Sequence, residues 1–574
     1  MILQALTKHY EDLVAKGVLS APGFGYAKIN FALEIDEEGN LVSVQTLGSP
    51  DEKGRMIPQR MLLPSPVKRA SNTLPNFLWD NSSYILGFDG KGKPERSKEC
   101  FEAARKLHSE LLGKSEDPFA KAVTAFFGKW IPGDSEHPAV AAKKEELSGA
   151  VNITFTFGSR FPSESEELKR IWQKHYDGAN ESAEETRCLV TGEKVIPEAT
   201  HPSVMKVRGA QSSGAALVSF NAPAFCSFGK EQNLNAPVGK YAAFAYTAAL
   251  NRLVDDREHN KLFGDTTVVY WAEGGESVYQ DFFGMSLDGS DEVTDKDLDE
   301  IMKKLSEGKP CDWDSIPLDP RNRFYVLGLA PNAARLSVRF FIADGFGELI
   351  GDIRKHYDRL RIIRPKTDKT VNPPMWRLLS ETVNKNSKDK KPSPQLAGDM
   401  LRAVLTGGDY PATLYQGVMM RIKAEKDISP DKAAIIKAYL LQKEYKKEVL
   451  TVELNENTNY LPYLLGRLFS VLENLQSAAN PGINTTIKDK YFTSAGATPS
   501  VVFPTLVNLA QKHLRKLEGG QKVFFSKKIG ELTSRITESY PKHLSLYDHG
   551  IFQLGYYHET QKRYESRKDN KEEN

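Results

Sequence analysis

The sequence has few cysteines and no long apolar run. Its four cysteines, Cys100, Cys188, Cys226 and Cys311, include no pair at CxxC spacing, which excludes a disulfide-rich scaffold and a four-cysteine zinc site. No stretch approaches the ~18 to 20 apolar residues that span a membrane. The first residues also lack the basic and then apolar pattern of a signal peptide. We therefore expect a soluble, intracellular protein in a reducing cytoplasm.

An excess of charge of one sign is also missing. Lys+Arg 77 against Asp+Glu 75 leaves a net charge of +2, so the whole chain is not a polyanion binder of the histone type. Any nucleic-acid surface must be a local patch. Gly 42 and Pro 31 are too few for a collagen-like or low-complexity chain, and 40% hydrophobic residues are typical of a globular protein. At roughly 150 residues per domain, 574 residues predict three or four folded units or one very large one.

The first 345 residues mix strand and helix patterns. Strand-like alternation or short apolar runs occupy 29–35, 41–47, 151–157, 216–220, 266–271, 324–329 and 336–343. Helical spacing occupies the stretches 97–112, 163–177, 239–255 and 294–306. Because the strand spacing is irregular, a regular βαβ alternation is not expected.

The rest of the chain has helical patterns only. They cover 346–360, 394–406, 411–424 and 430–447, while the polar stretch 385–394 predicts an exposed linker. Residues 451–574 predict a helical bundle whose charge is 16 Lys+Arg minus 13 Asp+Glu, or +3. The predicted fold is therefore α+β, an irregular mixed α/β body followed by an all-helical C-terminal bundle. The expected domains are 1–345, with room for two subdomains, a helical connecting region 346–450, and the bundle 451–574.

Several segments resemble enzyme motifs but lack the spacing that those motifs require. Gly113 precedes Lys and Ser as in a P-loop, but the required first glycine is His108, so a helix end is favoured. Residues 209–214 lack the G-x-S-x-G spacing of a nucleophile elbow, and His558-Glu559 lacks the second histidine of HExxH. Residues 188–192 resemble half of a zinc knuckle without its second cysteine, so a tight turn is favoured. No catalytic residue, metal or cofactor is predicted. A metal-dependent nuclease with an unrecognised carboxylate site is the alternative.

Three loops combine small, polar and basic residues. In 66–72 a proline-bracketed segment carries Lys68, Arg69, Ser71 and Asn72. In 207–214 glycines flank another polar set, which consists of Arg208, Gln211, Ser212 and Ser213. The amide-rich segment 221–235 carries Lys230. Lysine and arginine suit phosphates, while asparagine and glutamine suit base edges. An ordinary solvated loop is the alternative for each.

One segment is locally basic. Residues 354–369 contain seven cations and two acids, a balance of +5, and include Arg361, Arg364 and Lys366. The segment is either a phosphate-contacting stripe, whose affinity falls with salt, or a solvated helix face.

Several strings together resemble one known family. They are residues 1–6 with Tyr10, then 60–64, 68–69, 76–87, 208–225, 264–272, 405–411, 467–469 and 497–499. In this order and over nearly the whole chain, the sequence resembles the large subunit of the type I-C CRISPR-Cas surveillance complex, Cascade.

The resemblance implies a non-catalytic role in antiviral defence. Guide RNA reads the target by pairing, while the protein recognises a protospacer-adjacent motif in double-stranded DNA and helps to open the R-loop. The implied partners are target DNA, the guide-RNA complex through its handle-binding and backbone subunits, a small subunit, and a helicase-nuclease.

The resemblance also implies that the C-terminal part is made separately as the small subunit by internal translation. The start is either Met420, the last methionine, or a non-AUG codon nearer 451. The +3 charge of the bundle also suits a surface that lines displaced single-stranded DNA, with Tyr491, Phe492 or Tyr556 available for stacking if exposed.

Overall fold

The chain forms two compact units. The computed structural model describes residues 1–50, 56–67, 73–88, 93–149, 151–178, 185–291, 295–388 and 390–572. The larger unit comprises Met1–His9, Pro202–Ser219 and Ala249–Asn574, and the smaller unit comprises Tyr10–His201 and Phe220–Ala248. Two of the four unit boundaries fall inside helices, one in α1 (Ile2–Ala15) and one in α8 (Lys240–Asp255). They do not coincide with the expected boundaries at 345 and 450, which stay predictions.

A four-stranded sheet organises the smaller unit. Its order is β3-β2-β8-β7, and the central pair β2 and β8 is parallel whereas the outer pairs are antiparallel. The strands and helices of this unit are β1 (Phe24–Ile29), β2 (Phe31–Ile35), β3 (Leu41–Thr46), β4 (Ser49–Pro50), β5 (Met56–Ile57), β6 (Gln59–Pro64), β7 (Trp79–Asn81), α2 (Ser82–Ile85), α3 (Pro94–Leu112), α4 (Pro118–Lys129), α5 (Pro138–Ala141), α6 (Lys144–Leu147), β8 (Asn152–Phe157), α7 (Glu166–Gly178), β9 (Thr186–Arg187) and β10 (Lys194–Val195).

Successive side chains of β2 are buried on opposite faces of this sheet. Phe31, Leu33 and Ile35 pack into the larger cluster, which includes residues of α3 and α4. Ala32 points to the other face, where a second cluster holds residues of the β1–β6 pair. Side chains one position apart on a strand face opposite sides, so one strand supports both layers.

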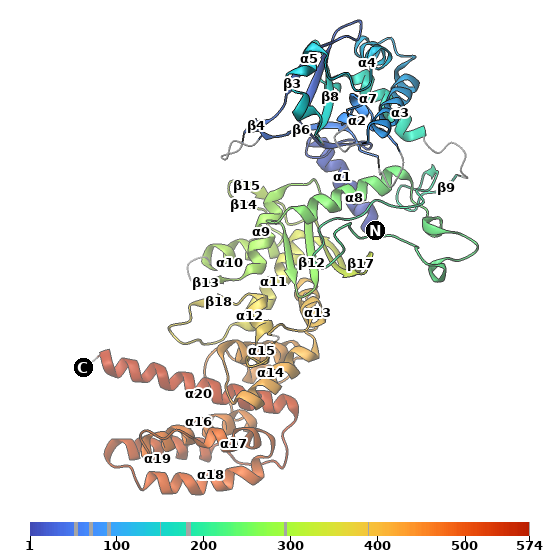
Figure 1. Cartoon of the computed structure of the whole chain (residues 1–574). Coiled ribbons are helices and arrows are strands. Elements are labelled where there is room, and N and C mark those ends of the chain that lie inside the picture. Colours follow the sequence, from blue (N-terminus) through green and yellow to red (C-terminus); the bar gives the residue numbers. More distant parts are fainter. Residues whose placement is uncertain are drawn as a thin grey trace. The chain divides into compact units, whose positions relative to one another are not determined.

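A second four-stranded sheet, fully antiparallel, organises part of the larger unit in the order β11-β12-β16-β17. The elements of this unit after α8 are β11 (Asn260–Phe263), β12 (Thr266–Ala272), α9 (Ser277–Asp288), β13 (Ser290–Asp291), α10 (Asp295–Ser306), β14 (Cys311–Trp313), β15 (Ile316–Leu318), β16 (Arg323–Asn332), β17 (Arg335–Gly345), α11 (Phe346–Leu360), β18 (Thr370–Asn372), α12 (Met375–Ser380), α13 (Pro394–Leu405), α14 (Ala412–Glu425), α15 (Pro430–Gln442), α16 (Leu461–Ala479), α17 (Ile487–Ala497), α18 (Pro499–Leu514), α19 (Gly519–Ser534) and α20 (Leu546–Glu572). Figure 1 shows these elements coloured along the chain.

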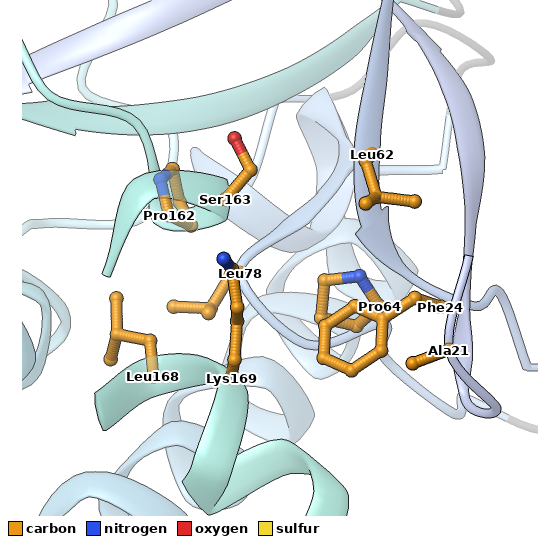
Figure 2. Close-up of a pocket in the computed structure, with 9 residues that line it drawn as sticks. All are labelled: Ala21, Phe24, Leu62, Pro64, Leu78, Pro162, Ser163, Leu168 and Lys169. Atoms are coloured by element: carbon orange, nitrogen blue, oxygen red, sulfur yellow. The ribbon is translucent and has the colours of Figure 1, made fainter. Parts of the chain in front are cut away.

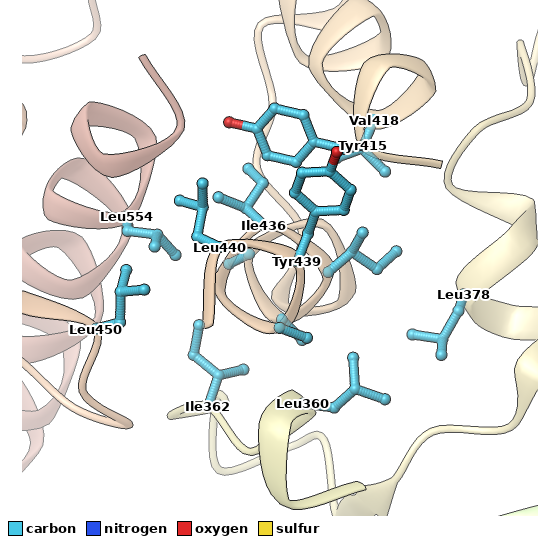
Figure 3. Close-up of a cluster of buried hydrophobic side chains, with 14 of the residues drawn as sticks. Leu360, Ile362, Leu378, Tyr415, Val418, Ile436, Tyr439, Leu440, Leu450 and Leu554 are labelled. Atoms are coloured by element: carbon cyan, nitrogen blue, oxygen red, sulfur yellow. The ribbon is translucent and has the colours of Figure 1, made fainter. Parts of the chain in front are cut away.

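One hydrophobic core joins the sheet of the larger unit to its helices. Its buried members run from Val268 in β12 to Tyr557 in α20 without a break at residue 450. Figure 3 shows the central part, where Ile436 and Leu440 of α15 lie between Leu554 of α20 and Leu378 of α12. Helix α15 is buried along most of its length, so it is a central helix of this core.

Helices α16 and α20 cross with their backbones close together. A Cβ on Gly466 would collide with the Phe552 carbonyl oxygen, and one on Gly555 would collide with the Tyr463 carbonyl oxygen. Glycine at both positions allows this approach. A buried ion pair also joins the two helices, since the Arg467 Nε of α16 donates to Glu559 Oε2 of α20 at 2.8 Å.

The predicted α+β class is confirmed, with 49% helix and 16% strand. The two expected hairpin strands at 29–35 and 41–47 are β2 and β3, and those at 324–329 and 336–343 are β16 and β17. The expected strand at 216–220 is wrong. Only Ala216 forms a bridge, to Arg335, and in the described residues no neighbouring strand pairs with the rest of that segment.

Candidate nucleic-acid interface

The polar loop 205–214 of the larger unit has a closed base. Val204 and Ala215 exchange backbone hydrogen bonds in both directions, each 2.9 Å long. The next residue, Ala216, donates to the Ala334 carbonyl at 3.0 Å and accepts from the Leu336 amide at 2.9 Å. These two partners belong to the turn and first residues of the β16–β17 hairpin, so the sheet carries the loop.

Two turns and two glycines shape the loop above this base. The Ala210 amide donates to the Val207 carbonyl at 3.1 Å, and the Gly214 amide donates to the Gln211 carbonyl at 2.9 Å. Gly214 has φ +88°, and a Cβ there would lie 2.6 Å from Met205 Sδ. A side chain at this position would therefore be strained and would also collide.

The predicted donors of this loop face solvent. Arg208, Gln211, Ser212 and Ser213 are all exposed, and within the described part of the chain their side chains make no hydrogen bond or ion pair. Lys206, by contrast, is paired with Asp255. The loop thus presents one free guanidinium, one amide and two hydroxyls on a fixed backbone.

In the other loop predicted to contact DNA, 66–72, the central residues lie outside the described part of the chain. They include Lys68, Arg69, Ser71 and Asn72. The described end is anchored, because the Val67 amide donates to Asn76 Oδ1 at 3.0 Å. The two loops belong to different units.

The basic segment 354–369 is paired with acids over much of its length. Arg354 Nε lies 3.1 Å from Asp299 Oδ1, and Lys355 Nζ lies 2.9 Å from Asp352 Oδ1. Arg361 is half-exposed and lies 3.4 Å from Asp358 and 3.8 Å from Asp299. The +5 balance of the sequence segment is therefore not a row of free cations.

Arg364 is largely enclosed by acidic side chains, and its contact with a phosphate stays a prediction. Its side chain is 8% exposed, and its two terminal nitrogens lie 2.7 Å from Asp368 Oδ2 and 2.7 Å from Asp431 Oδ1. Arg377 contacts the same two carboxylates. Burial alone would raise the pKa of Asp368, but hydrogen bonds from Arg377, Thr370 and Arg364 lower it well below its usual value.

Lys366 differs from its neighbour, because its side chain is exposed. It lines a cavity of about 300 Å³ with Ile363, Arg364, Pro365, Thr367, Gln561 and Tyr564. Of the three predicted residues in this segment, Lys366 and Arg361 are thus the more exposed.

Two of the three expected stacking residues in the C-terminal helices are buried. Phe492 and Tyr556 are 1% and 5% exposed, and their ring centroids lie 4.9 Å apart inside the core. The Tyr556 hydroxyl also donates to Glu473 Oε2 at 2.6 Å. They cannot stack on a nucleobase without unfolding α17 or α20. Tyr491 is half-buried.

Sequence reasoning missed a different aromatic in this region. Phe524 of α19 is 57% exposed. The exposed cations of α18, α19 and the turn between them are Lys512, Arg515, Lys516, Lys522 and Lys527. The signal was present as a Phe-Phe pair between lysines. Cations with an exposed aromatic suit the backbone and bases of a single strand.

The remaining sequence features are structural. Gly113 ends α3, with its amide 3.0 Å from the Ser109 carbonyl, as the helix-end interpretation predicts. Cys188 begins a tight turn that the Gly192 amide closes at 2.9 Å, as also predicted. Burial would raise the pKa of the Cys188 thiol, but amides of Gly239, Thr191 and Val190 lower it.

In the described residues, no three His, Cys, Asp or Glu side chains lie together as a metal site. No helix there combines the length and apolar content needed to cross a membrane.

The smaller unit contains an apolar cavity of about 180 Å³ (Figure 2). Its lining residues are Ala21, Phe24, Leu62, Pro64, Leu78, Pro162, Ser163, Leu168 and Lys169. The ammonium of Lys169 is paired with Glu166 Oε1 at 2.8 Å. Among the described residues, this lining includes no acidic side chain.

Comparison with known proteins gives one match to a family. The family model described as CRISPR-associated protein (Cas_Csd1) matches residues 6–564. No curated protein matches the chain. The matched range covers both units and the loop 205–214. The chain therefore belongs to the Cas_Csd1 family of CRISPR-associated proteins and is a large subunit of the type I-C Cascade complex.

Proposed function

We propose that this large subunit is non-catalytic, recognises the protospacer-adjacent motif in double-stranded DNA, and helps to open the R-loop. The observation that carries the proposal is the loop 205–214, which holds four exposed donor side chains on a base fixed by the β16–β17 hairpin. A reading surface needs such rigidity, because a base contact discriminates only when the donor is already in position.

The side chains of this loop divide by chemistry. Arg208 carries a permanent charge and suits a phosphate, whereas Gln211 can both donate to and accept from a base edge. Ser212 and Ser213 adapt to either. Lys68, Arg69, Ser71 and Asn72 are proposed for the same task from the residue types in their loop. Lys230 belongs to a different loop, treated below.

The C-terminal helices are proposed to support single-stranded DNA displaced by the guide. The exposed Phe524 and the cations of α18 and α19 support this role in place of Phe492 and Tyr556. The guide-RNA complex, a small subunit and a helicase-nuclease are the further proposed partners, and the cytoplasm is the proposed location.

The motif-reading proposal is tested with the assembled complex on DNA targets that differ only in the adjacent motif. Gln211→Ala should reduce the preference for the correct motif by about 1 to 3 kcal/mol, the usual cost of a lost base contact. Gln395→Ala, an exposed glutamine of α13, is the matched control and should leave the preference unchanged. An unaltered preference in both variants would show that Gln211 does not read the motif.

A second measurement tests the basic segment. Replacing Arg361 and Lys366 with glutamine should weaken binding equally on every target and lower the salt slope by up to about 0.9 per lost phosphate contact. Arg364 is left in place because it is part of a buried ion-pair cluster. An unchanged slope would favour the alternative of a solvated surface.

A metal-dependent nuclease is the alternative function. Incubating the chain with Mg²⁺ or Mn²⁺ and duplex DNA tests it directly. We expect intact DNA; cleavage that disappears when one carboxylate is replaced would establish the nuclease instead.

A further inference from the structure

Residues 221–235 of the smaller unit form a finger whose tip is Phe228. The Phe228 side chain is 99% exposed, and within the described chain no ring contact or cation-π contact reaches it. Its backbone has φ +53°, and the next residue, Gly229, has φ +71°. A bulky residue rarely adopts this left-handed conformation, because its backbone is strained there. The ring is therefore fully exposed on a strained backbone.

One asparagine fixes both sides of the tip. Asn235 Oδ1 accepts from the Ser227 amide at 2.8 Å, while its Nδ2 donates to the carbonyls of Lys230 at 3.0 Å and Gln232 at 2.9 Å. At the base, the Asn233 amide lies 3.3 Å from the Ala199 carbonyl, and the Asn233 residue is buried. The ring therefore stands on a fixed support.

The finger carries further exposed apolar surface and no net charge. Phe225 is 39% exposed and Leu234 is 42% exposed. Lys230 and Glu231 are adjacent, both exposed, and are the only charged residues between 221 and 235, so their charges cancel. A groove for nucleic acid needs an excess of cations, and this finger has none.

These properties are those of a protein-protein anchor. Aromatic residues are enriched and charged residues depleted at the centre of such interfaces, where a few rigid anchors carry most of the binding energy. We propose that the finger inserts Phe228 into an apolar socket on another protein subunit of the Cascade complex. The inference depends on the family membership of the chain and not on the proposed motif recognition.

The test measures assembly without target DNA. The probe is the guide-RNA complex that lacks this subunit, immobilised through a tag on a backbone subunit, and the full chain is the analyte. Phe228→Ala should weaken binding at least about tenfold, mainly through faster dissociation. Phe228→Leu should retain most of the affinity because it still fills an apolar socket. Phe228→Tyr should lose affinity because its hydroxyl would be buried without a partner.

The same variants separate the protein socket from a nucleobase. A stacked base would tolerate tyrosine and reject leucine, which is the reverse order and would overturn the proposal, as would an alanine variant that assembles like the natural chain. Ile131→Ala, in the same unit and 68% exposed, is the control and should assemble normally. All variants should keep the natural melting temperature, since none alters a buried side chain.

Discussion

At the scale of single residues, Arg364 and Lys366 have similar sequence surroundings but opposite environments. The Arg364 guanidinium is enclosed by Asp368 and Asp431, whereas Lys366 faces solvent. The sequence shows which residues of this segment are cations, but it does not show which acids pair with them. Asp431, which binds Arg364, is 67 residues away along the chain. Which cations remain free is decided by tertiary contacts that a local pattern does not contain.

We predict that Arg364→Gln destabilises the larger unit strongly. Removing one member of a buried ion-pair cluster leaves the carboxylate of Asp431, 3% exposed, with fewer partners, and such losses cost about 3 to 5 kcal/mol. Lys366→Gln is the matched control and should change stability little. The free energy of unfolding by denaturant should be measured for both variants. Equal values would contradict the structural role of Arg364.

His259 makes the stability of the larger unit depend on pH. Its Nδ1 lies 3.0 Å from Asp256 Oδ2, and its Nε2 lies 2.6 Å from Asp281 Oδ1. Burial alone would lower the pKa of His259, but hydrogen bonds and charges of Asp256 and Asp281 raise it above its ordinary value of 6.5. The folded state therefore binds this proton more tightly than the unfolded state.

We predict that the stabilisation from His259 is complete below its unfolded pKa of 6.5 and is lost as pH rises through the higher folded pKa. The melting-temperature difference between the natural chain and His259→Asn should be largest in mild acid and should narrow in alkali. A difference that widens with rising pH would show that the histidine is held neutral.

At the scale of elements, local sequence patterns predict many of the helices and strands. The hairpins β2–β3 and β16–β17 and the helices α3, α8 and α11 were predicted in this way. Helix α9 was missed because most of its side chains are buried, and a helix that is apolar all round loses its 3.6-residue period. The composition of loop 205–214 was predictable, but its support by the β16–β17 hairpin was not, because more than 100 residues separate them.

We predict that Gly214→Ala distorts the loop 205–214 without unfolding the chain. The added Cβ would have to displace Met205 Sδ and Ser203 Cβ, at 2.6 and 2.8 Å, in a left-handed backbone conformation. Motif preference of the assembled complex should fall, and hydrogen exchange at the Val204 and Ala215 amides should accelerate. Gly530→Ala, in α19 with open space around it, should change neither.

At the scale of the whole molecule, the hydrophobic core of the larger unit continues across residue 451, where the sequence predicts a domain boundary. Leu450 and Leu554 both belong to the hydrophobic cluster that contains α15 (Figure 3). The Tyr557 hydroxyl of α20 donates to the Ile363 carbonyl at 2.6 Å, and the Tyr415 hydroxyl of α14 donates to the Leu546 carbonyl at 2.9 Å. Sequence periodicity predicted the helices of this region, but it could not show which helices share a core.

We predict that a fragment starting at Met420 is more stable than one starting at residue 451. The longer piece keeps α15, which covers Leu554 and its neighbours on α20, although it loses Tyr415, whose ring stacks on Tyr439 at 4.5 Å. The shorter piece would expose that apolar face to water and should aggregate. Solubility and thermal unfolding by circular dichroism compare the two pieces.

A single substitution sharpens the comparison because its effect should change sign between the two contexts. In the fragment starting at 451, Leu554→Gln replaces an exposed apolar side chain and should improve solubility. In the full chain the same change removes a side chain that is 1% exposed in the core and buries an amide, which should cost about 2 to 5 kcal/mol. If Leu554→Gln lowers stability equally in both contexts, α15 is not what covers this face, and the helices after 451 form a core of their own.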